Sequence, residues 1–370
     1  KLMGWTPPTA SMCHSGGVVT PLREASVSKV ITIGLDIAKN VFHAHGADER
    51  GAMVFSRKLT RGKLLEFFAG QPPCTVALEA CGGAHHWARQ LQALGHDVRL
   101  IPPAYVKPFV KRNKNDAVDA EAICEAAQRP GMRFVAVKTE EQQAAGLVFR
   151  TRDLVVRQRT QLINAIRGHL AEYGWVAPRG TASMAMLADL LEDGDMASSL
   201  PEAARPMFKL MIDLLAELDE QIATLDREIA RRAKEDEAAR RLMAIPGIGP
   251  IAATAIIALA PPIETFRKGR DFAAWLGLAP RQHSTGGKQR LGSITKMGER
   301  TIRRLLIMGA SSVVLQASRR GAPGGSWLER MLARKPRMLV SVALANKMAR
   351  MVWALLTKRE DYRAPAAVSA

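Results

Sequence analysis

The chain has 370 residues, 47% of them hydrophobic, and a formal net charge of +18 at pH 7. This length suffices for two or three domains with buried cores, and the charge favours a polyanionic partner, above all nucleic acid. A membrane protein is not expected, because no apolar run reaches the roughly 20 residues that a spanning helix needs. The four cysteines form no CxxC pair, which is typical of a reduced, cytoplasmic protein without a zinc site.

The pattern along the first third of the chain predicts a mixed α/β domain. Residues 1–28 show little periodicity, so we expect a disordered leader. In residues 29–138, the segments VITIGLD, NVFHAHGA and AMVFSRKL predict three strands in an antiparallel meander. The segments that follow read as helix GKLLEFFAG, strand CTVALEA, helix AHHWARQLQALG, strand HDVRLIPP, a helix from Asp116 and a short strand RFVAV. This order implies a mixed sheet with helices on its faces.

The rest of the chain is predicted to be mostly helical. Residues 139–240 form a helical region with apolar residues at alternating spacings of three and four, a coiled-coil seam of about three heptads. The seam residues are Phe208, Met211, Leu215, Leu218, Ile222, Leu225 and Ile229. They predict pairing either with the earlier helix in residues 151–174 or with a second copy of the chain. Residues 241–360 form a C-terminal domain, and residues 361–370 a tail.

Four carboxylates are candidates for a metal site in the α/β domain. Asp36 and Glu79 each end an apolar strand, and Asp116 and Asp119 share one face of a helix start. Singly, each has an ordinary explanation: a turn residue, a surface acid, a helix N-cap or an acid that answers the helix dipole. Jointly, they would repel one another unless hard divalent cations, Mg²⁺ or Mn²⁺, neutralised them. Two such ions can activate a nucleophile and stabilise a leaving oxygen in phosphodiester cleavage.

Basic residues concentrate in the last quarter of the chain, where we expect the main nucleic-acid contacts. Residues 267–359 hold twenty Lys and Arg against three acids, an excess of 17 within the total of +18. Within the segment AIPGIGPIAATAIIA, Gly247 and Gly249 open an apolar helix whose N-terminus could meet a phosphate. The alternative is a tight turn between helices that needs glycine for its conformation alone.

A glycine-rich loop at residues 284–293 is predicted to bind phosphate. Ser284, Thr285 and Ser293 supply hydroxyls that could bond a phosphate or cap a turn. The predicted nucleic-acid contacts in and beyond this loop are Arg281, Lys288, Arg290, Lys296, Arg303 and Arg304. A second basic group, Lys111, Arg112 and Lys114, directly precedes the aspartate pair. Such cations would hold the scissile phosphate and stabilise its added charge.

The segments IGLDIAKN, VALEACGG and RNKNDAVDAEAI, together with the serine loop, resemble the blocks of the DEDD-type insertion-sequence transposases. That family includes Piv-like invertases and bridge-RNA-guided recombinases, and the resemblance runs from about Val30 to about Leu356. It implies an RNase H-like, RuvC-type N-terminal domain with Asp36, Glu79, Asp116 and Asp119 as metal ligands. It also implies a serine nucleophile in the glycine-rich loop. Counting backward from the motif GSITKMG places this residue at Ser284, whereas counting forward from the motif APRQ places it at Thr285. We favour Ser284.

The resemblance further implies donor and target DNA, a structured guide RNA and a dimer or tetramer as partners, in the bacterial cytoplasm beside the nucleoid. Two other functions compete with this interpretation. A Holliday-junction-type endonuclease would need the four acids but not the serine. A non-catalytic nucleic-acid-binding protein would need only the basic part of the chain.

Overall fold

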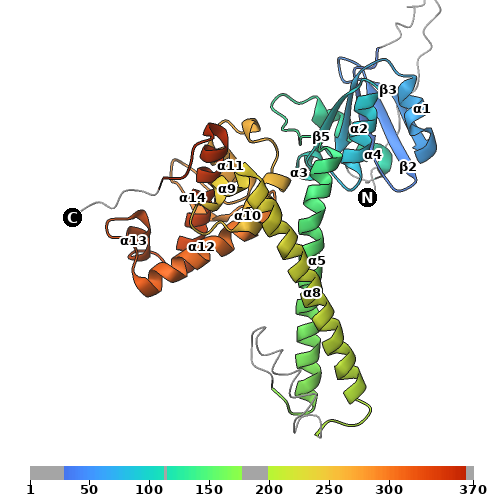
Figure 1. Ribbon diagram of the computed structural model, residues 1–370. Coiled ribbons are helices and arrows are strands. Elements are labelled where there is room, and N and C mark those ends of the chain that lie inside the picture. The colour runs from blue at the N-terminus through green and yellow to red at the C-terminus, as the bar shows by residue number, and fades with distance from the viewer. Residues whose placement is uncertain (1–28, 112–114, 177–198, 364–370) are drawn as a thin grey trace, which may run out of the picture. The chain divides into compact units, whose positions relative to one another are not determined.

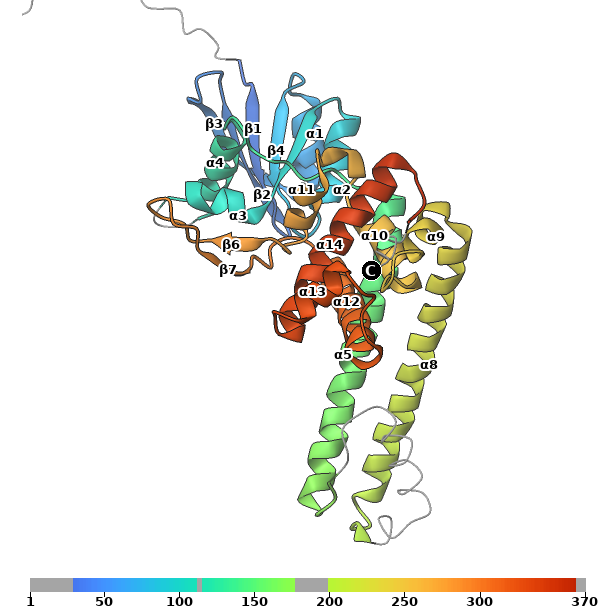
Figure 2. The same cartoon turned by 90° about the vertical axis from the view of Figure 1, so that its left-hand side faces the viewer.

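The computed structural model describes residues 29–111, 115–176 and 199–363, so the predicted leader and most of the predicted tail lie outside the described residues. The chain divides into two compact units, one ending at Val137 and the other beginning at Lys138. Figures 1 and 2 show both units from two sides. Each unit is described by itself.

A mixed sheet forms the centre of the first unit. Its strands, within the described residues, are β1 (Thr32–Asp36), β2 (Val41–Ala47), β3 (Met53–Thr60), β4 (Thr75–Glu79) and β5 (Asp97–Ile101). They lie in the order β3-β2-β1-β4-β5. The first three strands pair antiparallel, while β4 pairs parallel to both β1 and β5. The predicted meander and the predicted mixed sheet are thereby confirmed.

Helices cover both faces of this sheet, and the central strands β1 and β4 bury side chains on both sides. The helices are α1 (Leu64–Ala69), α2 (Ala84–Ala93), α3 (Pro103–Val106) and α4 (Asp116–Ala127), with 3₁₀ turns η1 (Arg61–Lys63) and η2 (Lys107–Phe109). On one face, Ile33 and Leu35 of β1 pack in a buried cluster with residues of α1 and α2. On the other face, Ala77 of β4 packs with Ile123 of α4. The side chains that face α4 are the ones that carry the chemistry described below.

The predicted strand RFVAV is wrong as a strand. In the described structure Val135 makes one isolated antiparallel bridge with Leu100, through a 2.7 Å bond from its N–H to the Leu100 carbonyl. The residue before Val135 does not pair with the sheet. Phe134 is exposed, and the Arg99 guanidinium lies 5.2 Å from the centre of the Phe134 ring. The short apolar run alone therefore overestimated the pairing at this edge.

Two long helices of the second unit pair with each other. Helix α5 (Glu140–Glu172) and helix α8 (Arg205–Glu235) lie side by side in both views (Figures 1 and 2). They run antiparallel, since Arg152 pairs with Asp226 at 2.5 Å and the later Arg159 pairs with the earlier Asp219 at 2.7 Å. The predicted seam of α8 packs against α5, so the structure shows the pairing within one chain that was one of the two alternatives.

The remaining elements of the second unit build a helical C-terminal part with one small hairpin. They are α9 (Glu237–Met243), α10 (Pro250–Leu259), η3 (Ile263–Thr265), α11 (Gly269–Trp275), β6 (Pro280–Gln282), β7 (Leu291–Ile294), α12 (Arg300–Arg320), α13 (Trp327–Leu332) and α14 (Arg337–Lys358). Residues of α9, α10, α11, α12 and α14 share one buried core. The hairpin of β6 and β7 extends from these helices (Figure 2).

One helix among the described residues, α14, is long and apolar enough by length and composition to cross a membrane. The expectation that the chain has no segment of this kind is therefore wrong. Its apolar side chains have partners inside the second unit: Val340, Met348 and Val352 are fully buried and belong to the C-terminal core. This packing is that of a central helix in a folded domain, for which apolar residues on most sides are expected.

Candidate active site

Three of the four predicted carboxylates come together in the first unit. Asp36 ends β1, and Asp116 and Asp119 lie in the first turn of α4. One carboxylate oxygen from each of the three lies within 4.8 Å of the others. Asp36 and Asp119 are half-buried and Asp116 is exposed, so the group opens to solvent on one side. We call these three residues the carboxylate cluster.

The position of α4 against β1 brings the cluster together. Gly34 makes this close approach possible, because a Cβ there would lie 2.2 Å from the carbonyl oxygen of Ala120. The helix is capped by Asn115, whose Oδ1 accepts a 3.0 Å bond from the N–H of Val118. The alternative that Asp116 is the N-cap is therefore wrong, and its carboxylate belongs to the cluster instead.

Glu79 lies beside the cluster rather than within its group of close oxygens. It ends β4, and the parallel pairing of Leu35 with Leu78 continues by one residue to set Glu79 next to Asp36. Paired residues of adjacent parallel strands point to the same face of the sheet. The charge of Glu79 reaches Asp36, since it contributes to raising the pKa of Asp36. All four predicted acids thus gather at one end of one sheet face.

His43 also belongs to this site, although the sequence did not single it out. It lies on β2 directly opposite Asp36 in the antiparallel register. Its Nε2 is 3.7 Å from a carboxylate oxygen of Asp116. The signal that could have found it is the meander itself, because a short turn between β1 and β2 brings a residue of β2 opposite the end of β1.

Burial and neighbouring charges raise the pKa of the Asp36 carboxyl above its ordinary value. Its pKa is raised to about 6, first by burial and then by the nearby charges of Asp119, Asp116 and Glu79 in that order, while His43 opposes them. A group of carboxylates with this mutual repulsion fits a hard divalent cation, which prefers oxygen ligands and removes the repulsion. The residues of the cluster therefore suit a divalent metal.

The predicted serine loop of the second unit is the tip of a β-hairpin. Strands β6 and β7 pair antiparallel around it, and the N–H of Lys288 bonds to the Thr285 carbonyl at 3.1 Å. The two residues between them, Gly286 and Gly287, have φ angles of +56° and +76°. Positive φ at both central positions is the geometry of a tight hairpin turn, which glycine adopts without strain. The Gly-Gly pair was the signal for a hairpin that the prediction of a loop missed.

Ser284 lies between β6 and the turn and is exposed along with its neighbours. Its Oγ accepts a 3.2 Å hydrogen bond from the backbone N–H of Arg290 across the hairpin. Arg281 and Lys288 are exposed on the same hairpin. A hydrogen bond from a fixed backbone N–H stabilises the negative oxygen that forms when a hydroxyl loses its proton, so this contact suits a nucleophile.

Comparisons with known proteins match both units. A transposase family model of the DEDD IS110 type matches residues 33–174, and the model described as "Transposase IS116/IS110/IS902 family" matches residues 239–322. The "Probable family 20 transposase" of Pseudomonas aeruginosa is 49% identical over 90% of this chain and 98% of its own length. The chain belongs to this DEDD transposase family. Two further relatives are the transposases for insertion sequence elements IS1328 of Yersinia enterocolitica, 41% identical, and IS1111A of Coxiella burnetii, 39% identical.

The IS1328 and IS1111A relatives cover 89% and 92% of this chain and 97% and 93% of their own lengths. The resemblance noted from the sequence blocks is thereby confirmed. Membership makes this transposase a DNA-cleaving and DNA-joining enzyme of an insertion sequence.

Several of the predicted nucleic-acid contacts of the transposase already have partners. The Lys111 ammonium lies 2.5 Å from a Glu121 carboxylate oxygen, and Arg112 and Lys114 lie outside the described residues. Arg304 forms an ion pair with Asp153. Exposed cations of the hairpin, in contrast, include Lys288 and Arg290, and Lys296 follows it with a left-handed φ of +56°.

Arg303 and Gly247 have structural roles in the described transposase. Arg303 is 9% exposed, and its guanidinium donates to the carbonyls of Leu276 at 2.9 Å and Met297 at 2.8 Å. A Cβ on Gly247 would lie 2.8 Å from the carbonyl oxygen of Gly309, so this glycine lets the turn approach α12. Its placement favours the alternative of a tight turn, whereas Gly249 at the start of α10 is exposed.

Removal of the Asp36 charge is expected to stabilise the metal-free transposase above pH 6. The folded-state pKa of about 6 exceeds the ordinary value of 3.8, so the folded state binds the proton more tightly than the unfolded chain. The wild type therefore loses stability as pH rises from about 4 through 6, and an Asp36→Asn variant does not. We expect a difference of about 1 kcal/mol at pH 7 after solvent screening, and none near pH 4.

Thermal unfolding in EDTA between pH 4 and pH 8 measures this difference. Glu49→Gln, at an exposed turn position of the same unit, is the control and should follow the wild type. A wild type whose stability relative to Asp36→Asn rises with pH would contradict the prediction. Adding Mg²⁺ should reverse the order at pH 7, because only the wild type retains the full cluster.

Proposed function

We propose that this transposase cuts and rejoins DNA with a carboxylate-bound Mg²⁺ site and a serine nucleophile, guided by a structured RNA. The observation that carries the proposal is the carboxylate cluster on one face of the mixed sheet. The sheet order, with a meander followed by parallel strands, supports an RNase H-like fold of the RuvC type for the first unit. Asp36, Asp116, Asp119 and Glu79 would hold the ions, with Mn²⁺ as an alternative to Mg²⁺.

The bound ions would supply Lewis-acid stabilisation of the charge that develops on the phosphate. In the proposed cleavage step, the Ser284 Oγ attacks the phosphorus and loses its proton to a base or water. The bond from phosphorus to the 3′ oxygen breaks, and that oxygen takes up a proton. The product is a 5′-phosphoserine link between protein and DNA. Rejoining is the reverse attack by a 3′ hydroxyl, which frees the serine and allows strand exchange through a Holliday-junction-like stage.

The cations of the hairpin would hold the DNA for this step. Arg281, Lys288 and Arg290 are exposed on the strands and turn that carry Ser284. Their positive charge would attract the phosphate backbone and stabilise the transition state. Binding to DNA and to the guide RNA should both weaken steeply as salt rises.

The predicted division of labour follows from these parts. The N-terminal domain up to about residue 138 would hold the metal, the helical region of residues 139–240 would space or join protomers, and residues 241–360 would grip DNA. The active species would be a dimer or tetramer, in which the metal site of one protomer completes the serine site of another. We place this activity in the bacterial cytoplasm.

The test compares Ser284→Ala, Thr285→Ala and Asp116→Asn on supercoiled donor and target DNA with Mg²⁺ and the RNA transcribed from the element's end. We expect Ser284→Ala to abolish the covalent protein–DNA adduct on a denaturing gel, while Thr285→Ala retains it. If Ser284→Ala still cleaves, a junction endonuclease that uses metal-activated water becomes the better explanation. If no variant changes cleavage while DNA binding persists, the chain acts as a binding protein only.

A further inference from the structure

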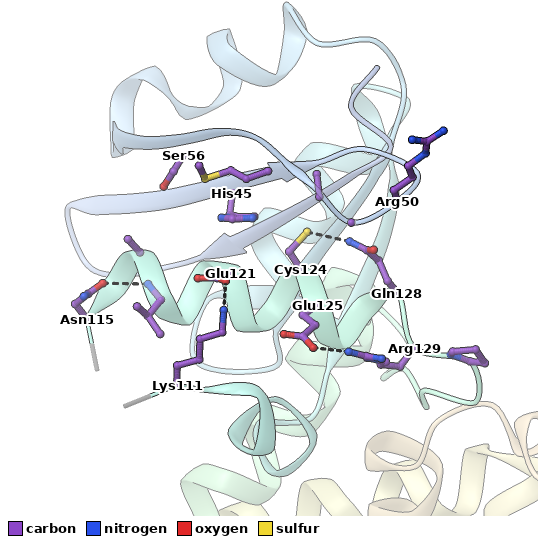
Figure 3. A pocket seen from close by; sticks show the side chains of 16 residues that line it. His45, Arg50, Ser56, Lys111, Asn115, Glu121, Cys124, Glu125, Gln128 and Arg129 are labelled. Carbon is purple, nitrogen blue, oxygen red and sulfur yellow. Dashed lines mark hydrogen bonds and ion pairs between the residues drawn. The ribbon is translucent and has the colours of Figure 1, made fainter. Parts of the chain in front are cut away.

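A groove of about 830 Å³ lies beside α4 on the sheet face that carries the carboxylate cluster. Strands β2 and β3 form one wall and the outer flank of α4 forms the other (Figure 3). Its lining residues include His45, Ser56, Val118, Cys124 and Gln128. We call it the α4 groove. Its volume falls in the range of sites that take small molecules, and it is too small for a nucleic-acid duplex.

His45 is the feature of the groove that points to a ligand. Its side chain is only 8% exposed, and it lines the groove between the sheet and α4 (Figure 3). Within the part of the chain that the structure describes, no hydrogen bond or ion pair reaches it. An imidazole that lines a groove without a protein partner leaves its ring nitrogens available to a ligand bound there.

His96 of the same unit shows what an ordinary buried histidine looks like. It is 4% exposed, and its Nε2 lies 3.1 Å from the carbonyl oxygen of Phe68. Its other nitrogen accepts from the N–H of Cys74 at 3.4 Å. The two buried histidines therefore differ in that His45 has no partner of this kind among the described residues.

The position of the groove connects it to the cluster. His43, which lies 3.7 Å from Asp116, and His45 are alternate residues of β2 and so point to the same face. Two residues along a strand span roughly 7 Å. The groove therefore begins about two strand residues, roughly 7 Å, away from the site where the scissile phosphate would bind.

The chemistry of the lining fits a nucleotide. Apolar side chains such as Met53 and Val118 can pack against a base, and Ser56 and Gln128 offer hydrogen bonds to its edge. Burial lowers the pKa of His45 from its ordinary value of 6.5; Glu121 opposes this effect and Lys111 adds to it, so the neutral imidazole, with one donor and one acceptor, is favoured.

The charges of the groove also fit a nucleotide. Glu121 and Glu125 are neutralised by ion pairs with Lys111 and Arg129, which leaves Arg50 as a cation at one end. This end can accept a flanking phosphate. The Watson–Crick edge of a base is free for such contacts only when the base is unpaired.

We propose that the α4 groove binds an unpaired nucleotide of the strand held at the carboxylate cluster, with His45 hydrogen-bonded to the base. This inference rests on the proposed function, since it assigns a substrate subsite to the same metal centre. Unpaired DNA and unpaired RNA share the chemistry that the groove recognises. The DNA strand to be cut is the ligand that the position beside the cluster favours.

The experiment uses the full chain and a 12-nucleotide oligothymidylate with one 4-thiothymidine, irradiated in Ca²⁺ to allow binding without cleavage. Cross-linked peptides are mapped by mass spectrometry. We expect adducts within residues 41–60 or 115–130. Ser56→Trp should reduce them at least tenfold, because Ser56 is exposed and an indole there fills the groove without disturbing the core. His45→Leu should do the same, and thermal unfolding checks that each variant folds.

Val54→Trp is the matched control, since Val54 is an exposed residue of the same strand and does not line the groove. An oligouridylate with 4-thiouridine and a fully paired duplex form the other arms. Weaker cross-linking by both supports an unpaired DNA strand, whereas stronger cross-linking by the RNA would overturn DNA as the ligand. Adducts that map elsewhere, or that persist in Ser56→Trp, overturn the groove proposal. The proposed function then still stands if Asp116→Asn abolishes cleavage.

Discussion

An Asp119→Asn variant is expected to fold and to bind DNA like the wild type, but to lose DNA cleavage by a factor of about 10³. The substitution keeps the size of the side chain and removes one of the three carboxylates whose oxygens lie within 4.8 Å of one another. Metal ions at such sites stabilise the transition state by several kcal/mol, and each 1.4 kcal/mol corresponds to about a tenfold change in rate.

Nicking of supercoiled DNA in Mg²⁺ measures this loss, and Mn²⁺ titration by calorimetry measures the accompanying loss of affinity. Glu66→Gln is the control, because Glu66 is an exposed acid of α1 outside the cluster. We expect it to match the wild type in both measurements. Cleavage by Asp119→Asn within tenfold of the wild-type rate would show that the cluster is not the metal site of the reaction.

A Gly34→Ala variant is expected to lose both stability and metal affinity, although it changes no polar group. The new methyl would lie 2.2 Å from the Ala120 carbonyl oxygen, 2.5 Å from the Cys124 nitrogen and 2.7 Å from the Cys124 Cβ. Two of these are backbone atoms of α4, so the helix itself must move away from β1. Overpacking of this kind costs about 2–4 kcal/mol of unfolding free energy.

The shift of α4 carries Asp116 and Asp119 away from Asp36, so Mn²⁺ affinity should fall by about 10–100-fold, as for other losses of support around metal ligands. Chemical denaturation and Mn²⁺ calorimetry provide the two measurements. Gly62→Ala is the matched control, because a Cβ at Gly62 meets no atom within 4 Å. A Gly34→Ala variant with the stability of Gly62→Ala would refute the close packing of α4 on β1.

The sequence predicted the carboxylate site from the ends of regular elements. Asp36 and Glu79 are each the first charged residue after a short apolar run, which is the pattern of a buried strand ending at a charge. The register between β1 and β4 then sets the two acids side by side. What the pattern could not supply was the distance between elements, which depends on the packing of α4 against Gly34. For this reason the three-residue cluster, with Glu79 beside it, emerged only from the structure.

Other features escaped the sequence because they depend on contacts between distant residues. Arg303 looked like a surface cation in a basic segment, but the carbonyls of Leu276 and Met297 hold it in the interior. His43 gained its meaning only from its register opposite Asp36. The hairpin around Ser284 was within reach, since Gly286 and Gly287 carry a turn signal that the helical context of the region obscured.

The apolar packing between the paired helices α5 and α8 changes along their length. At their base, Phe149 and Ile229 belong to the C-terminal core, whereas farther out Val155 and Phe208 belong to two smaller, separate apolar clusters. An arm of this kind, about 50 Å long, can open from its outer end while its root stays folded. Evolution can therefore exchange or lengthen the outer end by whole heptads without remodelling the domain in which the arm is rooted.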